Sequence, residues 1–337
     1  MQMKKLGILG LDNWYYTFLV GKLGQQSGRF KVTAAYDQNQ AHLKEFAAQF
    51  MVEATGSPES LVAREDVEAV VVGSATGLHL QDLKPVLAQK KPVLLAKPLA
   101  MSYADAKTIL SQLKEAGVPA GMLHNYRFNP VLRMVKSLLE EGVIGEITSL
   151  YDITHATLPE GWPGMGHPGW YDEKDLAGGG GFIDHAAHTV DTMLWYIGSQ
   201  PKSVSATIAN IRQAGLKSED YGIAIVTFEN GVIGTVESTW LGKTSQLRIT
   251  GTAGEIFVER GSRPTITVRK NSDVGTEVIH VVEGLSFLDV VGKLVDNFLD
   301  VIEGKSENVV PVEQGVEALK LIEKAYEAAR SGRVIMF

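Results

Sequence analysis

Residues 4–15 read KKLGILGLDNWY, a short apolar run that ends at Gly10 and is followed by a polar turn. The run predicts a first β-strand over Lys5–Leu9, and about six apolar residues are too few for a secretory signal. A Rossmann fingerprint has glycine at three positions after such a strand, where the backbone turns tightly and approaches a pyrophosphate. Only the first glycine is kept, since Asp12 and Tyr15 replace others. The loop alone is weak evidence for a dinucleotide site, whose candidate residues here are Gly10, Asp12, Asn13 and Trp14.

The first third of the chain alternates short apolar runs with longer amphipathic segments, a pattern typical of βαβ units and a parallel sheet. The predicted strands are Lys5–Leu9, Lys31–Tyr36, Ala69–Val72, Val93–Leu95 and Ala120–Leu123, and the predicted helices are Gln40–Phe50, Leu78–Gln89 and Tyr103–Ala116. Ser102 is a suitable N-cap for the last helix, and Gly117 lies just past its end. We therefore predict a doubly wound Rossmann domain over residues 1–123.

The pattern changes after residue 124. Helices are predicted from Pro130 to Gly142 and over Phe182–Tyr196, and several strands then follow without helices between them. The predicted strands are Ser203–Arg212, Tyr221–Phe228, Val232–Thr239, Gln246–Thr250, Ile256–Glu259 and Thr265–Arg269, and the closing helices are Phe287–Glu303 and Val312–Arg330. Asn230-Gly231 is a strong hairpin signal. Residues 124–337 are thus predicted to form an α+β domain on a mostly antiparallel open sheet, and we expect this domain to bind the substrate.

The composition excludes several classes of protein. A chain of 337 residues favours two domains over one. Its net charge of −7 lacks the basic excess that nucleic-acid binding needs, and the absence of cysteine removes thiol chemistry and disulfides. No apolar stretch approaches the roughly 18 to 20 residues that span a bilayer. We expect a soluble, cytoplasmic protein that binds neither nucleic acid nor membrane.

Asp37 follows the second predicted strand, about 20 residues past the glycine loop, where an acid can accept hydrogen bonds from the adenosine ribose. This position favours NAD over NADP. Asp37 could equally cap the helix that begins near Gln40, and the two interpretations are compatible.

The segment Gly178–Asp191 carries the strongest indication of a catalytic site. Four glycines, Gly178 to Gly181, permit close backbone approach to a ligand at the start of a predicted helix. Asp184, His188 and Asp191 follow at i, i+4 and i+7, which places them on one helix face. Imidazole is well suited to take a proton from an alcohol near neutral pH, so we predict that His188 is the general acid/base. A purely structural role is the alternative for a lone helical histidine.

Lys97 is the third candidate catalytic residue. It follows a buried parallel strand, at the edge where open α/β sheets bind ligands, and could hydrogen-bond a reacting hydroxyl. Aromatic and imidazole side chains that could bind a sugar surround the glycine run, and the candidates are His155, Trp162, His167 and Trp170. The tryptophans could instead pack between domains. The histidines show no metal-site spacing, so we predict no metal.

Several of these stretches resemble the glucose-fructose oxidoreductase, inositol dehydrogenase and MocA (Gfo/Idh/MocA) family over nearly the whole chain. The family's Glu-Lys-Pro motif is similar to Ala96-Lys97-Pro98, and its glycine run followed by Asp and His is similar to Gly178–His188. Other similar stretches are Ser74–His79, Tyr126–Pro130, Gly142–Gly145 and Gly251–Gly254.

The resemblance implies a catalytic group of Lys97, Asp184 and His188, with the histidine as acid/base during hydride exchange with a nicotinamide. It also adds Ser74, Thr76, His79 and Lys97 to the cofactor-binding residues, and Tyr126 and Arg127 to the substrate residues. Asp12, Tyr15 and Ala96 depart from the family pattern, the first two in the phosphate loop and the third directly before Lys97.

We therefore predict an NAD(H)-dependent oxidoreductase that transfers a hydride to or from a secondary hydroxyl of a sugar, inositol or related polyol. NADP is less favoured, and the family suggests a homodimer or homotetramer. One alternative is an NAD-dependent enzyme that cleaves glycosides without net redox change. Another is an inactive protein that binds a sugar or dinucleotide and regulates other processes.

Overall fold

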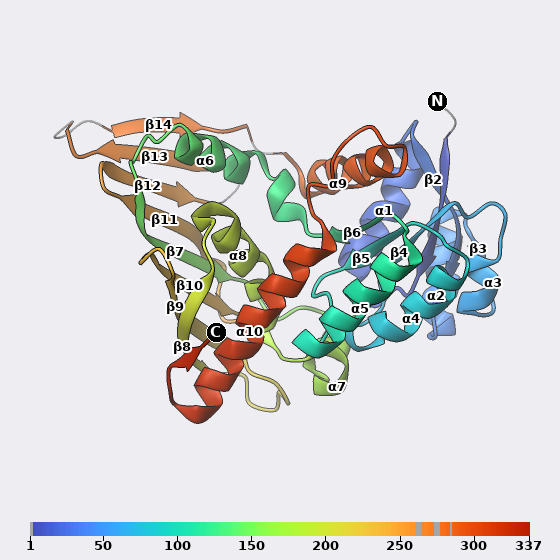
Figure 1. Ribbon diagram of the computed structural model, residues 1–337. Coiled ribbons are helices and arrows are strands. Elements are labelled where there is room, and N and C mark those ends of the chain that lie inside the picture. Colours follow the sequence, from blue (N-terminus) through green and yellow to red (C-terminus); the bar gives the residue numbers. More distant parts are fainter. Residues whose placement is uncertain (1–2, 261–263, 273–276, 284) are drawn as a thin grey trace. The chain divides into compact units, whose positions relative to one another are not determined.

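The computed structural model describes residues 3–260, 264–272, 277–283 and 285–337 (Figure 1). The chain forms two compact units. The first contains Met1–Asn125, Glu160–Gly178 and Ser286–Val316, and the second contains Tyr126–Pro159, Gly179–Leu285 and Glu317–Phe337. The first boundary lies close to the predicted one, but two later segments return to the first unit, which the division at residue 123 did not anticipate.

The first unit contains a parallel sheet of six strands within the described residues, in the order β3-β2-β1-β4-β5-β6. These strands are β1 (Lys4–Leu9), β2 (Phe30–Tyr36), β3 (Glu53–Ala54), β4 (Ala69–Val72), β5 (Val93–Ala96) and β6 (Ala120–Leu123). The helices between them are α1 (Trp14–Gln26), α2 (Gln40–Phe50), α3 (Pro58–Val62), α4 (His79–Ala88) and α5 (Tyr103–Ala116). The Rossmann prediction is confirmed.

Local sequence explains most of these elements. All four residues of β4 are buried, as expected for a central parallel strand that is covered on both faces. Ser102 accepts a hydrogen bond from the Asp105 N–H at 3.1 Å, and Gly117 ends α5 in the left-handed conformation. Strand β3 and helix α3 were not predicted, because they are too short to show a period, and helix α1 was not predicted either.

The two returning segments complete the first unit. They contain the short helix α7 (Lys174–Ala177) and the longer helix α9 (Phe287–Ile302). Helix α9 packs on α1, where the rings of Tyr16 and Phe287 lie 5.8 Å apart, and Arg29 pairs with Asp300 at 2.6 Å. The Rossmann unit therefore includes segments that lie far from its sheet strands along the chain.

The second unit contains a nine-stranded sheet within the described ranges, in the order β14-β13-β12-β11-β7-β10-β9-β8-β15. The strands are β7 (Ile147–His155), β8 (Pro201–Ala209), β9 (Tyr221–Phe228), β10 (Ile233–Thr239), β11 (Ser245–Gly251), β12 (Gly254–Glu259), β13 (Thr265–Lys270), β14 (Glu277–Val281) and β15 (Ile335–Met336). Strands β7 and β10 pair in parallel, and the other pairs are antiparallel. The predicted mostly antiparallel sheet is confirmed, although β7, β14 and β15 were not predicted.

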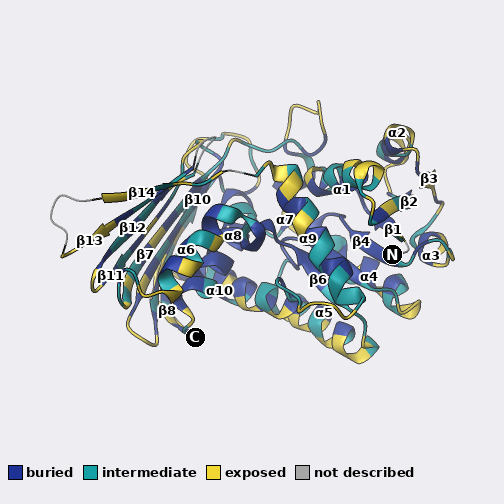
Figure 2. Ribbon diagram, turned by 90° about the horizontal axis from the view of Figure 1, so that it is seen from above, coloured by how far each residue is buried: buried dark blue, intermediate teal, exposed yellow. Residues whose placement is uncertain are grey.

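Helices α6 (Pro130–Glu140) and α8 (Gly181–Ile197) lie against one face of this sheet (Figure 2). Glycines on the strands allow α8 to approach closely, since a Cβ at Gly222 would collide with Phe182 and one at Gly234 with Met193. Helix α10 (Val312–Ser331) starts in the first unit and continues in the second. Among the described residues, no helix is both long and apolar enough to cross a membrane.

Candidate active site

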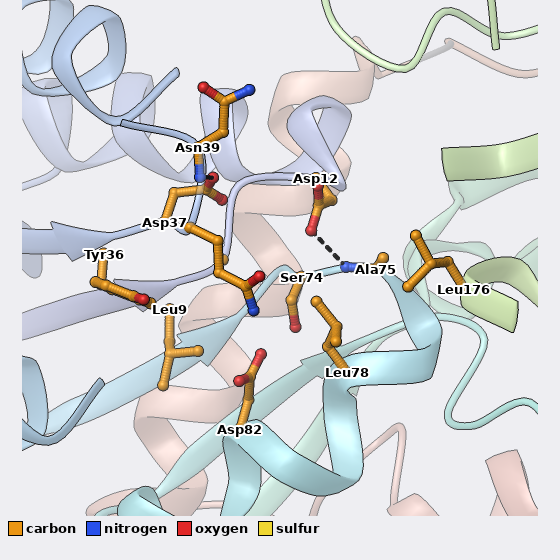
Figure 3. Close-up of a pocket in the computed structure, with 12 residues that line it drawn as sticks. Leu9, Asp12, Tyr36, Asp37, Asn39, Ser74, Ala75, Leu78, Asp82 and Leu176 are labelled. Atoms are coloured by element: carbon orange, nitrogen blue, oxygen red, sulfur yellow. Dashed lines mark hydrogen bonds between the residues drawn. The ribbon is translucent and has the colours of Figure 1, made fainter. Parts of the chain in front are cut away.

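A pocket lies at the carboxyl ends of β1, β2 and β4 in the first unit (Figure 3). Its lining residues are Leu9, Gly10, Asp12, Tyr36, Asp37, Gln38, Asn39, Ser74, Ala75, Leu78, Asp82 and Leu176. Strand β1 lies between β2 and β4 in the sheet. Strands β2 and β3 are added on one side of β1 and strands β4 to β6 on the other, so the direction of strand addition reverses at this point. Open α/β sheets bind ligands at such a reversal, outside the carboxyl ends of the strands.

Gly10 shapes the floor of this pocket. Its φ is +79°, and a Cβ at this position would collide with both the backbone and the side chain of Ser74. Any other residue would therefore be strained and would also push apart the ends of β1 and β4. The first glycine of the loop is thus required by the local backbone.

Asp37 ties the end of β2 to the loop after β1. One carboxylate oxygen accepts a hydrogen bond from the Leu11 N–H at 2.6 Å, and the other accepts one from the Asn39 N–H at 2.7 Å. The N-cap of α2 is Asn39, whose side chain accepts from the Ala41 and His42 N–H groups. The alternative in which Asp37 itself caps that helix is therefore wrong.

Three carboxyl groups, those of Asp12, Asp37 and Asp82, surround the pocket (Figure 3). Burial raises the pKa of Asp12 to about 6, and the charge of Asp37 adds to this effect. Burial also raises the pKa of Asp82 to about 6, again with a contribution from its acidic neighbours. Asp12 accepts a hydrogen bond from the Ala75 N–H at 2.9 Å, which holds its carboxyl group beside the loop. The pocket is therefore strongly acidic when these groups are ionised.

Five of the predicted cofactor-binding residues do not line this pocket. His79 is fully buried, with its ring nitrogens 3.0 Å from the carbonyl oxygens of Leu99 and Ser74. The Asn13 side chain donates to the carbonyl of Lys97 at 3.2 Å. Both contacts support the loops after β4 and β5. The five residues are Asn13, Trp14, Thr76, His79 and Lys97, and their contact with a cofactor stays a prediction.

Two of the predicted substrate residues, Trp162 and Trp170, pack within the first unit and are 5% and 8% exposed. The Trp170 indole donates to the carbonyl of Asp12 at 2.9 Å. The Trp162 ring stacks on His42 at 3.8 Å, and its N–H donates to Glu45. Both indoles thus contribute to packing around the glycine loop, and a role in substrate binding for them stays a prediction. His167, in the same segment, is exposed and accepts from the Gly169 N–H at 3.2 Å.

The glycine run has a structural partner in the second unit. One carboxylate oxygen of Glu219 accepts from the Gly180 N–H at 2.6 Å, from the Phe182 N–H at 3.3 Å and from the Tyr326 hydroxyl at 2.6 Å. A Cβ at Gly180 would also collide with the Glu219 carbonyl. The expectation that these glycines leave room for a ligand is therefore corrected at Gly180, where the protein's own backbone fills the space.

Asp184 and His188 lie on α8, as predicted. Asp184 accepts a hydrogen bond from the Trp240 indole at 3.0 Å, and the same oxygen lies 3.5 Å from Nε2 of His185. The His188 imidazole is 6% exposed and stacks on the Tyr126 ring, with 4.5 Å between centroids and 13° between planes. Both candidate catalytic side chains are thus held by aromatic neighbours.

Asp191 and Arg127 form a buried bidentate ion pair, with N–O distances of 2.8 and 2.9 Å. Their side chains are 5% and 7% exposed. The guanidinium carbon of Arg127 also lies 5.3 Å from the centroid of the Trp195 ring. Asp191 is therefore committed to an ion pair, although its spacing from His188 placed it on the predicted catalytic face.

His155 lies on the other face of the sheet from α8. Leu150, Asp152 and Thr154 are buried on the helix-covered face, so the alternation along β7 points His155 away from it. Its Nε2 atom is 2.9 Å from Glu237, which also accepts from the Tyr151 hydroxyl. The strand therefore separates this predicted substrate residue from His188.

Two family models match the chain. Residues 4–124 match the oxidoreductase family with an NAD-binding Rossmann fold, and residues 132–257 match the GFO/IDH/MocA C-terminal domain. The chain belongs to the Gfo/Idh/MocA family of oxidoreductases.

Relatives in the family act on sugars. A 1,5-anhydro-D-fructose reductase from Ensifer adhaerens is 26% identical over 338 residues, which cover 98% of each chain. A 2,7-anhydro-N-acetylneuraminate hydratase from Escherichia coli is 29% identical over 255 residues, which cover 71% of this chain and 66% of the relative. A levoglucosan dehydrogenase in complex with NADH and levoglucosan has the same fold, with a TM-score of 0.87 at 19% identity over 99% of each chain.

The catalytic residues expected in a Gfo/Idh/MocA oxidoreductase are divided along the chain. Lys97 belongs to the first unit, is 8% exposed and precedes a cis peptide bond to Pro98. Asp184 and His188 belong to the second unit. Asp82, which lines the pocket, was not predicted. The available signal was an acidic residue about one turn after His79, on the helix that follows β4. Trp240 was not predicted either, because it lies far from Asp184 along the chain and no local pattern indicates their contact.

Proposed function

We propose that this protein is an NAD(H)-dependent dehydrogenase or reductase that acts on a secondary hydroxyl group of a sugar or polyol. The observation that carries the proposal is the pair of Asp184 and His188 on α8, next to the glycine run that the family resemblance associates with catalysis. Membership of an oxidoreductase family and the sugar substrates named for its relatives support it.

In this mechanism His188 takes the hydroxyl proton from the substrate while the carbon gives up a hydride. NAD, when bound, supplies the hydride acceptor. Asp184 is oriented by the Trp240 indole and lies one helical turn before His188, where its carboxylate would favour the protonated form of the His188 imidazole. Lys97 stays a proposed catalytic residue, which the resemblance of Ala96-Lys97-Pro98 to the family's Glu-Lys-Pro motif supports. In the reductive direction His188 returns the proton.

The pocket of the first unit has the features that an adenosine diphosphate group requires. Gly10 lets the backbone approach a phosphate, and the N-terminus of α1 follows directly. Asp37 can accept from the ribose hydroxyls with its remaining lone pairs, although it already binds two backbone N–H groups. Asp37 and Asp82 would both repel a 2′-phosphate, so we propose NAD over NADP.

The function is tested by a panel of substrates suggested by the relatives. Purified protein is expected to oxidise NADH with 1,5-anhydro-D-fructose or to reduce NAD⁺ with levoglucosan, myo-inositol or D-xylose. Absorbance at the nicotinamide band measures turnover, and NADH fluorescence measures binding. Absence of both turnover and binding across the panel would refute the proposal.

Asp12 is expected to make cofactor binding dependent on pH. Its carboxyl group keeps a proton up to about pH 6, so it loses that proton and repels a pyrophosphate above this pH. The affinity for NAD⁺ should therefore fall by roughly tenfold between about pH 5.5 and about pH 8. Asp12→Asn should bind NAD⁺ more tightly than the wild type at the higher pH and show a weaker pH dependence.

Calorimetric titration at the two pH values measures this effect. Asp66→Asn is the matched control, because Asp66 is an acid of the same unit that lies outside the pocket and pairs with Arg64. An Asp12→Asn protein that binds NAD⁺ no better than the wild type at the higher pH would place the pyrophosphate away from Asp12.

A second candidate is a reaction in which the substrate is oxidised and then reduced again, so that a bond is cleaved without net redox change. The hydratase among the relatives favours this candidate. Product formation without accumulation of NADH would identify it. Turnover of either kind would reject the inactive regulatory protein. A homodimer or homotetramer stays a prediction, and the sheet face opposite α6 and α8, where Ile225 and Ile233 are about half exposed, is a candidate surface for it.

A further inference from the structure

Four side chains form a continuous row in the second unit, from the interior of the sheet to the candidate acid/base. Asp152 accepts from Nη2 of Arg260 at 2.9 Å. The guanidinium carbon of Arg260 lies 5.5 Å from the centroid of the Tyr126 ring, and that ring stacks on the His188 imidazole at 4.5 Å. A fixed ion pair is thus separated from the imidazole by one aromatic ring.

The sheet positions the ion pair. Asp152 points inward from the middle of β7 and is fully buried, while Arg260 follows β12 and reaches across β11 to it. The Arg260 N–H also donates to the carbonyl of Ser245 at 3.0 Å, which fixes the start of the side chain. Thr154, the next inward residue of β7, receives a weak contact from Nη1 of Arg260 and hydrogen-bonds the Tyr126 side chain.

Stability alone is a poor explanation for this pair. Removing two charges from water costs several kcal/mol per ion, and apolar residues of similar size often stabilise a core as well or better. The pair lies in a sheet whose other inward positions are mostly apolar, and it adjoins the ring that contacts His188. Its position therefore calls for a role in the chemistry of that histidine.

The charges of the pair act on His188 in opposite directions. The Arg260 cation disfavours a second positive charge on the imidazole, and the Asp152 carboxylate favours it. Other groups also face His188 or its neighbours, namely Asp184 and His185 on α8, the Asp191–Arg127 ion pair, and Tyr196, whose hydroxyl donates to Leu132. Tyr196 also interacts with Arg260 and Asp152, but burial raises the pKa of its hydroxyl, which therefore stays neutral while a histidine titrates. All of these groups are present in every variant, so a comparison of variants isolates the ion pair.

We propose that Arg260 and Asp152 are positioning residues for His188, which act through Tyr126 to orient the imidazole and to set the pH range over which it exchanges a proton. The inference deepens the proposed function, because it concerns the acid/base of that reaction. Its test is direct titration of His188, which does not require turnover.

The experiment is NMR titration of the histidine side chains in the full-length protein, with the His188 signal assigned by its loss in His188→Asn. A unit charge roughly 10 Å away at an effective dielectric near 20 shifts a titration midpoint by about 1 pH unit. Arg260→Met should raise the midpoint of His188 by this amount, because the cation is lost. Asp152→Asn should lower it, because the cation remains alone. The double variant should titrate close to the wild type.

Two further variants keep the test decisive. Arg260→Lys retains the cation and should titrate close to the wild type even if its hydrogen bonds change. Arg269→Met removes an exposed arginine of the same sheet and should leave His188 unaffected. Should Arg260→Met fail to fold, Arg260→Gln and Asp152→Asn provide the same comparison.

Opposite shifts in the two single variants would establish the proposal. Shifts of the same sign, or a lower melting temperature with no shift, would show that the pair is only structural. Arg260→Lys behaving like Arg260→Met would also overturn it. If opposite shifts occur but no panel substrate reacts, the positioning role holds and the proposed function fails. If turnover occurs without opposite shifts, the proposed function holds and the positioning role fails.

Discussion

Replacing His188 with asparagine is expected to lower kcat/KM for the reacting sugar by about 10²- to 10⁴-fold, the usual contribution of a positioned general acid/base. Asparagine is polar and of similar length, but it cannot take up a proton in this pH range. The affinity for NADH should be unchanged, because the pocket that we assign to the cofactor belongs to the other unit. Steady-state kinetics and NADH fluorescence measure the two effects separately.

His155→Asn is the matched control for this experiment. It removes a more exposed imidazole from the opposite face of the same sheet, where His155 pairs with Glu237. Its kcat/KM should remain close to that of the wild type. A His188→Asn enzyme that keeps most of its activity would mean that another group accepts the substrate proton.

Breaking the ion pair of Arg127 and Asp191 is expected to have the largest effect on stability. Arg127→Met leaves a buried carboxylate without its cation and should lower the free energy of unfolding by about 3–5 kcal/mol. The double variant Arg127→Met/Asp191→Leu removes both charges and should recover most of this loss. Denaturation by urea, followed with a separate probe for each unit, measures the difference.

The control for this prediction is an arginine on the surface. Arg248 pairs with Glu255 on β11 and β12, and its side chain is 59% exposed. Arg248→Met should leave the unfolding midpoint almost unchanged, since exposed ion pairs contribute little. If the double variant were as unstable as Arg127→Met, the lost stability would come from packing around Trp195 rather than from the unpaired, buried carboxylate of Asp191.

The elements that could be predicted from sequence are those with strong local signals. Strand β4 and helix α5 have the predicted bounds, because a fully buried strand reads as one apolar run and the helix is bounded by Ser102 and Gly117. Strand β7 was not predicted because two of its inward positions carry Asp152 and Thr154. Polar residues at buried positions hide the alternation by which a half-buried strand is recognised.

Local sequence predicted the helix that carries Asp184 and His188 but not the contacts of these side chains. Helical spacing correctly placed Asp184 and His188 on one helix. The partners that define their surroundings, among them Trp240 and Tyr126, lie more than 50 residues away along the chain, where no local pattern indicates them. The same limit explains why Glu219 was not expected beside the glycine run.

The return of residues 160–178 and 286–316 to the first unit affects how genes of this kind can recombine. A crossover after codon 125 would join the Rossmann sheet of one lineage to residues 160–178 and helix α9 of another. Contacts such as Arg29 with Asp300, and Trp170 with the Asp12 carbonyl, would then have to form between residues that never evolved together. Lineages that exchange substrate specificity are therefore expected to do so by point changes and loop replacement, while the chain is inherited as one piece.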